Sequence, residues 1–358
     1  MTAGPDAVLR PSRARDRYVS LYADLSRQVQ AEGLQRRRYG YYWTCFALAV
    51  TAFVGIWAGV AILRDSWFQL VLAASLALVS AQFGFLGHDA AHRQIFTSPR
   101  WNEWASRVIS GALTGLSYGW WIKKHNRHHS GPNQVDRDPD IDPGVFAFTP
   151  DDATARSGAA AAFTRRQGWW FFLLLPLEGL NLHVQSVRTV VGSAPLRLRW
   201  VEATFLAVRL GGYLAVLSLL LPPGKAIAFV AVQLALFGVL LGGAFAPNHI
   251  GMPIVPATAR PDFLRRQVLM SRNISGGALV GFFMGGLNHQ IEHHLFPSMP
   301  RPSLRRARRL VREHCAVHGI DYTETTLLQA YSAIVRYLNT VGLRDRDPFR
   351  CPLVTLHR

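Results

Sequence analysis

The sequence predicts an all-α integral membrane protein with four transmembrane helices in two hairpins and a helical cap that carries a histidine-rich site. Long uncharged runs alternate with arginine-rich segments, and the histidines gather where the uncharged runs end. The chain has 358 residues, 49% of them hydrophobic, and a formal net charge of +17. Positive residues beside anionic lipid explain this charge better than nucleic acid does, because nucleic-acid-binding proteins do not carry such apolar runs.

The first predicted hairpin consists of spans at about 41–63 and 67–86, neither of which contains a charged residue. Roughly 20 residues in a helix cross a hydrocarbon layer of about 30 Å. Only Arg64, Asp65 and Ser66 join the two spans. The spans must therefore run antiparallel.

The second predicted hairpin has spans at about 200–221 and 226–247, joined by residues 222–225. Its first span contains Glu202 and Arg209. A charge at membrane depth is costly. Of the four predicted spans, this one alone contains charged residues.

The arginines predict the topology. The first 40 residues contain eight arginines, whereas the two hairpin links contain only Arg64 and Lys225 as basic residues. By the positive-inside rule, we expect a basic cytoplasmic segment at 1–40, a membrane domain at 41–299 and a cytoplasmic helical tail at 300–358. No apolar core follows the first arginines, so no signal peptide is expected. The preference for arginine over lysine hints at a high-GC bacterial genome, hence a bacterial cytoplasmic membrane.

Two apolar stretches, at 169–177 and 276–287, are too short to span the membrane. We expect them to lie at the membrane–water interface or to cover a buried site. The three cysteines, Cys45, Cys315 and Cys351, are scattered and form no Cys-x-x-Cys pair. This excludes a disulfide framework and a thiolate metal site.

The histidines are the strongest signal in the sequence. Ten of the 13 lie between residues 88 and 294. Three clusters have helical spacing: His88 and His92; His125, His128 and His129; and Gln290, His293 and His294. His88 and His249 each follow directly after a predicted span, so helices that prolong the spans can bring distant histidines together. We therefore expect a metal site; only His314, His318 and His357 are better explained as ordinary polar residues.

The number of candidate ligands favours iron. A zinc ion takes about four ligands, so eight or more are too many for one zinc, and the His-Glu-x-x-His signature of zinc proteases is absent. Imidazole also suits iron, and two iron ions would account for the number. An iron pair with open positions can activate O2 to attack an unactivated C–H bond.

At these residues the sequence resembles the membrane fatty acid desaturase family. The resemblance rests on H-x-x-x-H at 88–92, H-x-x-H-H at 125–129, Q-x-x-H-H at 290–294 and the two hairpins, and it covers roughly residues 40 to 340. The glutamine variant is similar to the front-end and linoleoyl-CoA-type branch. The resemblance implies a diiron enzyme that uses O2 and two electrons to insert a cis double bond into a fatty acyl chain, carried on CoA or on a phospholipid.

The resemblance also implies a ligand set. Eight residues match it: His88, His92, His125, His128, His129, His249, His293 and His294. A ninth ligand is Gln290, His289 or His183, and the sequence leaves this open. The acids Asp89, Asp138, Asp140 and Glu292 could accept hydrogen bonds from the far imidazole nitrogens.

The sequence contains no haem-binding His-Pro-Gly-Gly and no G-x-G-x-x-G that opens a helix after a strand. A fused cytochrome b5 domain is therefore not expected, and the electrons would come from a ferredoxin with its reductase or from a cytochrome b5-type donor. The arginines at 301, 305, 306, 308 and 309 could dock that donor or hold a substrate headgroup. Two alternatives stay open: a diiron acyl or lipid hydroxylase on the same scaffold, and a non-catalytic histidine-rich metal-binding or transport protein of the membrane. Histidines at the ends of spans, rather than at their midplane, count against transport.

Overall fold

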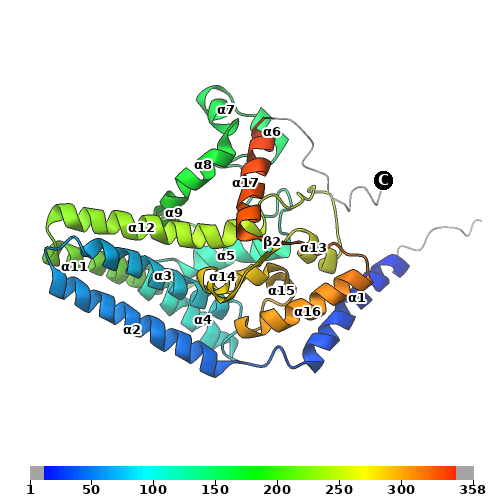
Figure 1. Ribbon diagram of the computed structural model, residues 1–358, viewed down its shortest axis with the longest axis horizontal. Helices are drawn as coiled ribbons and strands as arrows, with labels where there is room; N and C mark the ends of the chain where they lie inside the picture. The colour runs from blue at the N-terminus through cyan, green and yellow to red at the C-terminus, as the bar shows by residue number, and fades with distance from the viewer. Residues whose placement is uncertain (1–11, 344–358) are drawn as a thin grey trace, which may run out of the picture.

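A computed structural model describes residues 12–343, with side chains described from residue 21 onward. The outer parts of the two predicted end segments, 1–11 and 344–358, lie outside the described residues, as does His357. The regular secondary structure of the described chain is almost entirely helical (Figure 1).

Four helices are long and apolar enough to cross a membrane, at Tyr39–Leu63, Gln69–Ala91, Arg199–Leu220 and Pro223–Asn248. They correspond to α2 (Tyr39–Leu63), α3 (Gln69–Ala91), the series α10 (Arg199–Leu206), η3 (Ala207–Gly211) and α11 (Gly212–Leu220), and α12 (Pro223–Phe245) followed by η4 (Ala246–Asn248). In Figure 1, α2, α3 and α12 lie alongside one another. The four predicted spans are thus confirmed as membrane-length helices.

The two charges of the third span are satisfied inside the protein. Glu202 is buried, forms an ion pair with Arg107, and accepts a hydrogen bond from the backbone N–H of Gly119 at 3.0 Å. Arg209 lies in the π-helix η3 and donates its Nε–H to the carbonyl of Leu113 at 2.9 Å. Buried charges persist when they are paired in this way.

The helices after the first hairpin position three of the site histidines. The amphipathic helix α4 (Pro99–Val108), capped by Ser98, continues into the π-helix η1 (Ile109–Thr114). Helix α5 (Tyr118–Ser130) then begins at Ser117, whose side chain accepts from the N–H of Trp120. Glu202 and Ser117 together fix the start of α5, the helix that carries three of the histidines.

A further set of short helices follows α5, and its last members pack against α12. After α6 (Pro150–Thr154) and α7 (Gly158–Thr164), the chain forms α8 (Gln167–Leu174), η2 (Leu175–Leu177) and α9 (Glu178–Val191). Helix α9 packs against α12 at Gly179, where an added Cβ would lie 2.2 Å from the carbonyl oxygen of Leu234. Only glycine permits this approach.

The remaining elements form a cap at one end of the bundle (Figure 1). They are α1 (Ser12–Ala31), α13 (Phe263–Leu269), β1 (Asn273–Ser275), α14 (Ala278–Phe283), η5 (Leu287–His289), α15 (Gln290–Leu295), α16 (Arg301–Val317), β2 (Glu324–Thr326) and α17 (Leu327–Gly342). Strands β1 and β2 pair in parallel, with Ile274 opposite Thr325. The predicted helical tail is confirmed in α16 and α17, but strand β2 was not predicted, because three residues are too few for an alternating pattern.

A buried apolar cluster joins α1, α13, α15 and α16, with Leu25, Val268, Ile291 and Val311 each fully buried. The hydroxyl of Tyr22 donates to the carbonyl of Leu295 at 3.0 Å. This packing holds the short helix α15, and with it the third histidine cluster, against the end of the bundle.

Candidate metal centre

The helices deliver the histidines of all three sequence clusters to one place. His88 lies in the last turn of α3 and His92 at its C-terminal cap. Helix α5 contributes His125, His128 and His129, and α15 contributes His293 and His294. His249 follows η4 at the end of the fourth span. Segments 200 residues apart in the chain thus meet at the junction of the bundle and the cap (Figure 1).

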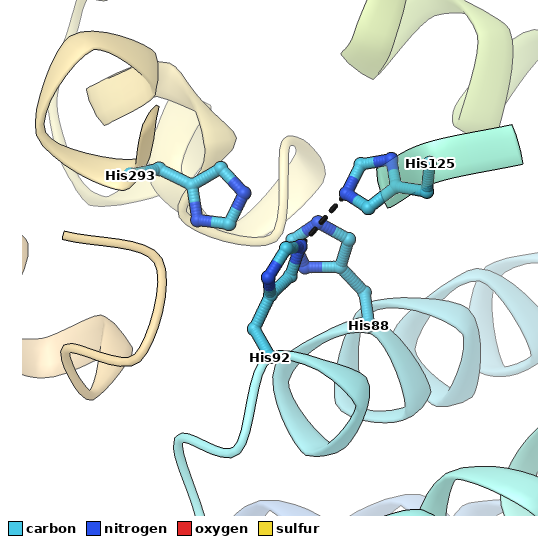
Figure 2. Close-up of side chains that lie close together, drawn as sticks. All are labelled: His88, His92, His125 and His293. Carbon is cyan, nitrogen blue, oxygen red and sulfur yellow. Dashed lines mark hydrogen bonds between the residues drawn. The ribbon is translucent and has the colours of Figure 1, made fainter. Parts of the chain in front are cut away.

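Four rings form the first histidine group, which consists of His88, His92, His125 and His293 (Figure 2). Their candidate ligand nitrogens all lie within 4.8 Å of one another. The Nε2 atoms of His92 and His125 are 2.8 Å apart. His129 adjoins this group, with its Nε2 at 3.0 Å from that of His125 and 3.2 Å from that of His293.

Three rings form the second histidine group, which consists of His128, His249 and His294, again with ligand nitrogens within 4.8 Å. The Nε2 atoms of His128 and His249 are 3.3 Å apart. The side-chain amide of Gln290 lies beside this group, with its Nε2 at 3.0 Å from the Nε2 of His249. The structure therefore brings Gln290 to the site.

These distances fit a metal ion in each group. Two imidazole nitrogens bound at about 2.1 Å to one ion lie about 3.0 Å apart when they subtend a right angle. The Nε2 atoms of His88 and His294 are buried and have no hydrogen-bond partner among the described residues. A buried polar atom without a partner is costly, and an ion would satisfy it.

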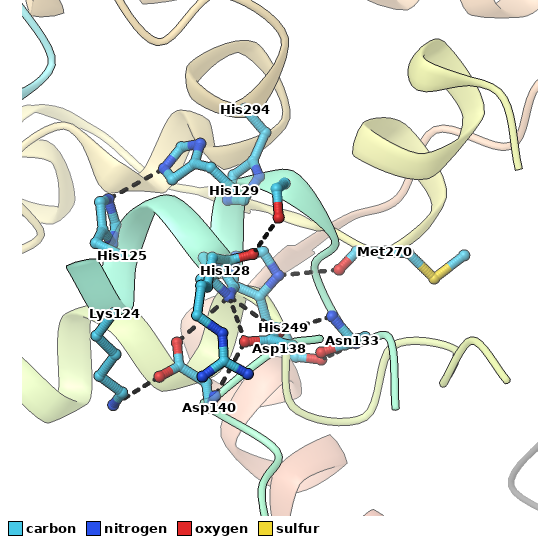
Figure 3. Close-up of polar contacts among 12 residues, drawn as sticks. Lys124, His125, His128, His129, Asn133, Asp138, Asp140, His249, Met270 and His294 are labelled. Atoms are coloured by element: carbon cyan, nitrogen blue, oxygen red, sulfur yellow. Dashed lines mark hydrogen bonds and ion pairs between the residues drawn. The ribbon is translucent and has the colours of Figure 1, made fainter. Parts of the chain in front are cut away.

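Oxygen atoms behind the second group fix which nitrogen each ring presents (Figure 3). His249 places Nδ1 at 3.0 Å from the carbonyl oxygen of Met270, and His294 places Nδ1 at 3.0 Å from Oε1 of Gln267. A carbonyl oxygen only accepts, so Nδ1 must carry the proton and Nε2 is left free as a ligand.

Asp138 fixes in the same way which ring nitrogen of His128 faces the metal site. Both its carboxylate oxygens lie 3.0 Å from the Nδ1 of His128, and the carboxylate is itself held by the backbone N–H groups of Asn133 at 2.7 Å and Asp140 at 3.0 Å. Burial alone would lower the pKa of His128, but the charge and hydrogen bond of Asp138, together with the charge of Asp140, outweigh it and raise that pKa. Asp138 thus orients a ligand and increases its basicity.

The other rings of the site are held neutral. Burial, together with the neighbouring His128, lowers the pKa of His92 to about 3 and that of His249 to about 3. Burial and neighbouring histidines also lower the pKa of His125, His129 and His293 well below the usual range. Neutral imidazole is the form that binds a metal ion.

Each of the three other acids considered from the sequence pairs with a group outside the two sets of histidines. Asp140 forms an ion pair with Lys124 at 2.7 Å and lies 3.3 Å from the Nδ1 of His128. Asp89 pairs with Arg301 at 2.6 Å. Glu292 accepts hydrogen bonds from Tyr322 and Asn273, whose side chain also binds the N–H of Ile291, so these groups hold α15 rather than an imidazole.

The structure does not bring His183 or His289 into either histidine group. The ring nitrogens of His183 face the carbonyl oxygens of Gly179 at 2.6 Å and Thr114 at 3.1 Å. His183 therefore bridges α9 to the end of η1. His289 lies at the end of η5 beside α16, where burial and then the charges of Arg308 and Arg305 lower its pKa to about 4.

A cavity of about 600 Å³ extends from the site. Its inner wall includes His88, His125, His128, His249 and Gln290. The rest of the lining is largely apolar and includes Gly84, Leu116, Trp121, Phe146, Phe171, Leu174, Leu175, Leu241 and Phe245. The expectation that segment 169–177 covers a buried site is confirmed by Phe171, Leu174, Leu175 and Leu177 in this lining.

Some residues that shape the site have no signal in the sequence. Trp121 stacks on His125 with ring centroids 4.4 Å apart, and Gln267 connects His294 to the carbonyl of His129. The one available clue was the position of Trp121 one helical turn before His125.

The sequence is similar to those of known proteins. The model of the fatty acid desaturase family matches residues 65–326, which include every histidine of the site. The chain is 33% identical over 283 residues to the acyl-lipid (9-3)-desaturase of Physcomitrium patens, covering 76% of this chain and 53% of the moss protein. It is 32% identical over 299 residues to fatty acid desaturase 3 of Bos taurus, covering 80% of this chain and 65% of the bovine protein.

A third relative, the Delta(6)-fatty-acid desaturase fat-3 of Caenorhabditis elegans, is 27% identical over 338 residues, covering 90% of this chain and 75% of the nematode protein. The chain thus spans about half the length of the moss relative and about three quarters of the nematode one. The family match covers most of the described chain and contains both histidine groups. The chain belongs to the fatty acid desaturase family.

Proposed function

We propose that this protein inserts a cis double bond into a fatty acyl chain, with two iron ions, O2 and two electrons. One observation carries the proposal: two buried histidine groups lie side by side on the wall of a largely apolar cavity of about 600 Å³. A metal site against apolar walls suits a reaction at an unactivated hydrocarbon. The names of the relatives, which specify fatty acids or acyl lipids, support the same substrate.

The residues of the two groups would hold one ion each, with His129 and Gln290 beside them. When bound, the iron ions would supply the O2 activation that removes one hydrogen from each of two adjacent methylenes. The balance is one CH2–CH2 unit, O2, two electrons and two protons giving CH=CH and two water molecules. The donor supplies the electrons, and the protons come from solvent.

The apolar lining positions the acyl chain and excludes water. Trp121, held flat against His125, and Phe245, one turn before the end of the fourth span, flank the histidines within the cavity. Gly84, one turn before His88 on α3, lines the cavity without a side chain and so leaves room for the acyl chain.

We further propose that the site and both termini face the cytoplasm of a bacterium and that the donor docks on α16. Helix α16 packs against α15, which carries His293 and His294, and none of its residues lines the cavity. Arg305, Arg309 and Arg312 lie on one exposed face and form no ion pair within residues 21–343. A free basic face next to the metal site suits an acidic ferredoxin or cytochrome b5-type protein.

The docking proposal is tested with the double substitution R305E/R309E. Reversing two charges should raise the KM for the donor at least about tenfold at low salt and leave the KM for the acyl substrate unchanged, because rim charges mainly affect association. The matched control is Arg188→Glu, an exposed arginine on α9. An unchanged donor KM in R305E/R309E would contradict this docking face.

The function is tested by expressing the chain with a ferredoxin and its reductase in a desaturation-deficient bacterial host and profiling fatty-acid methyl esters. A new double bond that disappears in His128→Ala and persists in His318→Ala, an exposed histidine of the cap, supports the proposal. A hydroxylated product would keep the diiron site and change the reaction. A chain that binds no iron would refute the enzyme proposal.

A further inference from the structure

The cavity opens where its lining residues are exposed. Val145 and Leu177 are 61% and 56% exposed, whereas the lining near the histidines is buried. The mouth of the cavity consists of Lys124, Asp140, Val145, Leu177, Glu178 and Asn181. These residues come from α5, the loop after it, η2 and α9.

The charges of the mouth are predominantly negative. Lys124 is already paired with Asp140, with Nζ and Oδ1 2.7 Å apart. Glu178 accepts a hydrogen bond from Asn181 at 3.1 Å. Lys124 is the sole lysine or arginine among the residues that line the cavity, so the mouth offers two carboxylates and one ammonium group.

This charge distribution does not suit coenzyme A. A CoA thioester carries three phosphate groups, and proteins bind phosphate through unpaired arginine and lysine side chains. The chain has 39 lysine and arginine residues in all, so their scarcity at the mouth does not reflect composition. Arg156 lies near the mouth, but it donates to the carbonyls of Gly144 and Val145, each at 2.7 Å. Like charges at a cleft repel an anionic ligand.

An exposed apolar face adjoins the same mouth. Trp169, Trp170, Leu173, Leu177 and Leu180 are 61%, 41%, 66%, 56% and 49% exposed. They lie on the α8–η2–α9 segment, whose η2 and α9 parts pack against α12, a membrane-length helix, while α8 packs against α17. Tryptophan is enriched where a membrane meets water, and an apolar face of this size is compatible with lipid rather than with water. The mouth is therefore bordered by a surface that continues the membrane-facing side of the bundle.

We propose that the acyl chain enters this cavity sideways from the bilayer, still esterified to a membrane glycerolipid, and not as an acyl-CoA from solution. The α8–η2–α9 face would lie in the lipid, and the headgroup would stay outside the mouth. This inference rests on the proposed desaturase function and specifies the carrier of its substrate.

The test uses the purified full-length protein, loaded with iron, in phosphatidylcholine vesicles with ferredoxin, reductase and O2. The same labelled acyl chain is offered either in phosphatidylcholine or as its CoA thioester, with no acyltransferase present. We expect initial desaturation of the lipid-linked chain to be at least about tenfold faster. Equal or faster desaturation of the CoA thioester would overturn the inference and leave the proposed function intact. A double bond in neither carrier would refute the proposed function, and the inference with it.

A variant pair isolates the apolar face. Leu173→Glu places a charge on the exposed face of α8 without altering the lining, and should lower the lipid-linked rate about tenfold. Leu328→Glu introduces the same charge at an exposed apolar position at the start of α17 and should not. Iron content, measured in both variants, shows that the site has assembled. Equal lipid-linked rates in the two iron-loaded variants would contradict entry beside α8.

Discussion

The two histidine groups differ in what stands behind their rings. In the second group, His128, His249 and His294 each direct Nδ1 to an oxygen atom of Asp138, Met270 or Gln267. In the first group, the shortest such contact is the 3.6 Å from His88 Nδ1 to Asp89, and within the described chain His92, His125 and His293 have no oxygen acceptor on Nδ1. The second group is thus oriented by the protein alone, whereas the first depends more on the ion it binds.

The largest expected effect comes from removing one ligand of the first group. His92→Ala should lower double-bond formation at least about 100-fold, while the pre-oriented second group keeps its ion and the chain retains about one iron. Product analysis and iron content measured on the same sample test this. Loss of all iron would show that the two groups bind as one unit, which would break the comparison.

A smaller effect is expected from the support of the second group. Asp138→Asn removes the charge behind His128 and places an NH2 group against the N–H of Asn133 or Asp140, so iron affinity should fall about 10- to 100-fold. Competition with a chelator measures this affinity. The matched control is Asp136→Asn, an exposed acid of the same loop with φ of 64°, a conformation that asparagine tolerates. Equal affinities in the two variants would contradict the role of Asp138.

The smallest effect concerns pH. In the iron-free protein, burial lowers the pKa of His92 and His249 to about 3, while the unfolded chain takes up these protons near pH 6.5. The unfolded state therefore binds more protons between these values, and stability falls as pH drops below about 6.5. His128, whose pKa is raised, makes stability rise as pH drops, but its effect is outweighed by the several histidines whose pKa values are lowered. A Tm that is equal at pH about 7.5 and about 5.5 would contradict this.

The sequence predicted the spans and the histidine clusters because both depend on local patterns. A run without charges shows a membrane-length helix, and the i, i+3, i+4 spacing places the rings of α5 on one side. The π-helices η1 and η3 and the pairing of β1 with β2 were not predictable, since they depend on contacts between segments far apart in the chain. The same holds for the pairing of Glu202 with Arg107, which turns a costly charge in the third span into an anchor for α5.

The choice among His183, His289 and Gln290 illustrates the same limit. His289 and Gln290 adjoin predicted ligands in the sequence, whereas His183 lies far from any. Only the packing of α15 against α13, and the hydrogen bond from Asn248 to Gln290, show that Gln290 lies at the site. His183 could bind a metal by its chemistry, but both of its ring nitrogens face backbone carbonyls, so it connects two helices instead.

The arrangement of the ligands along the chain fixes the order in which the site can be assembled. The last two rings, His293 and His294, are synthesised after both membrane hairpins, and Arg301, which pairs with Asp89 next to the first ring, comes later still. A ribosome that has produced only the first hairpin and α5 exposes five of the histidines without their partners. The metal centre can therefore be completed only after residue 294 has been synthesised, and truncation anywhere before residue 293 leaves a site in which neither histidine group is complete.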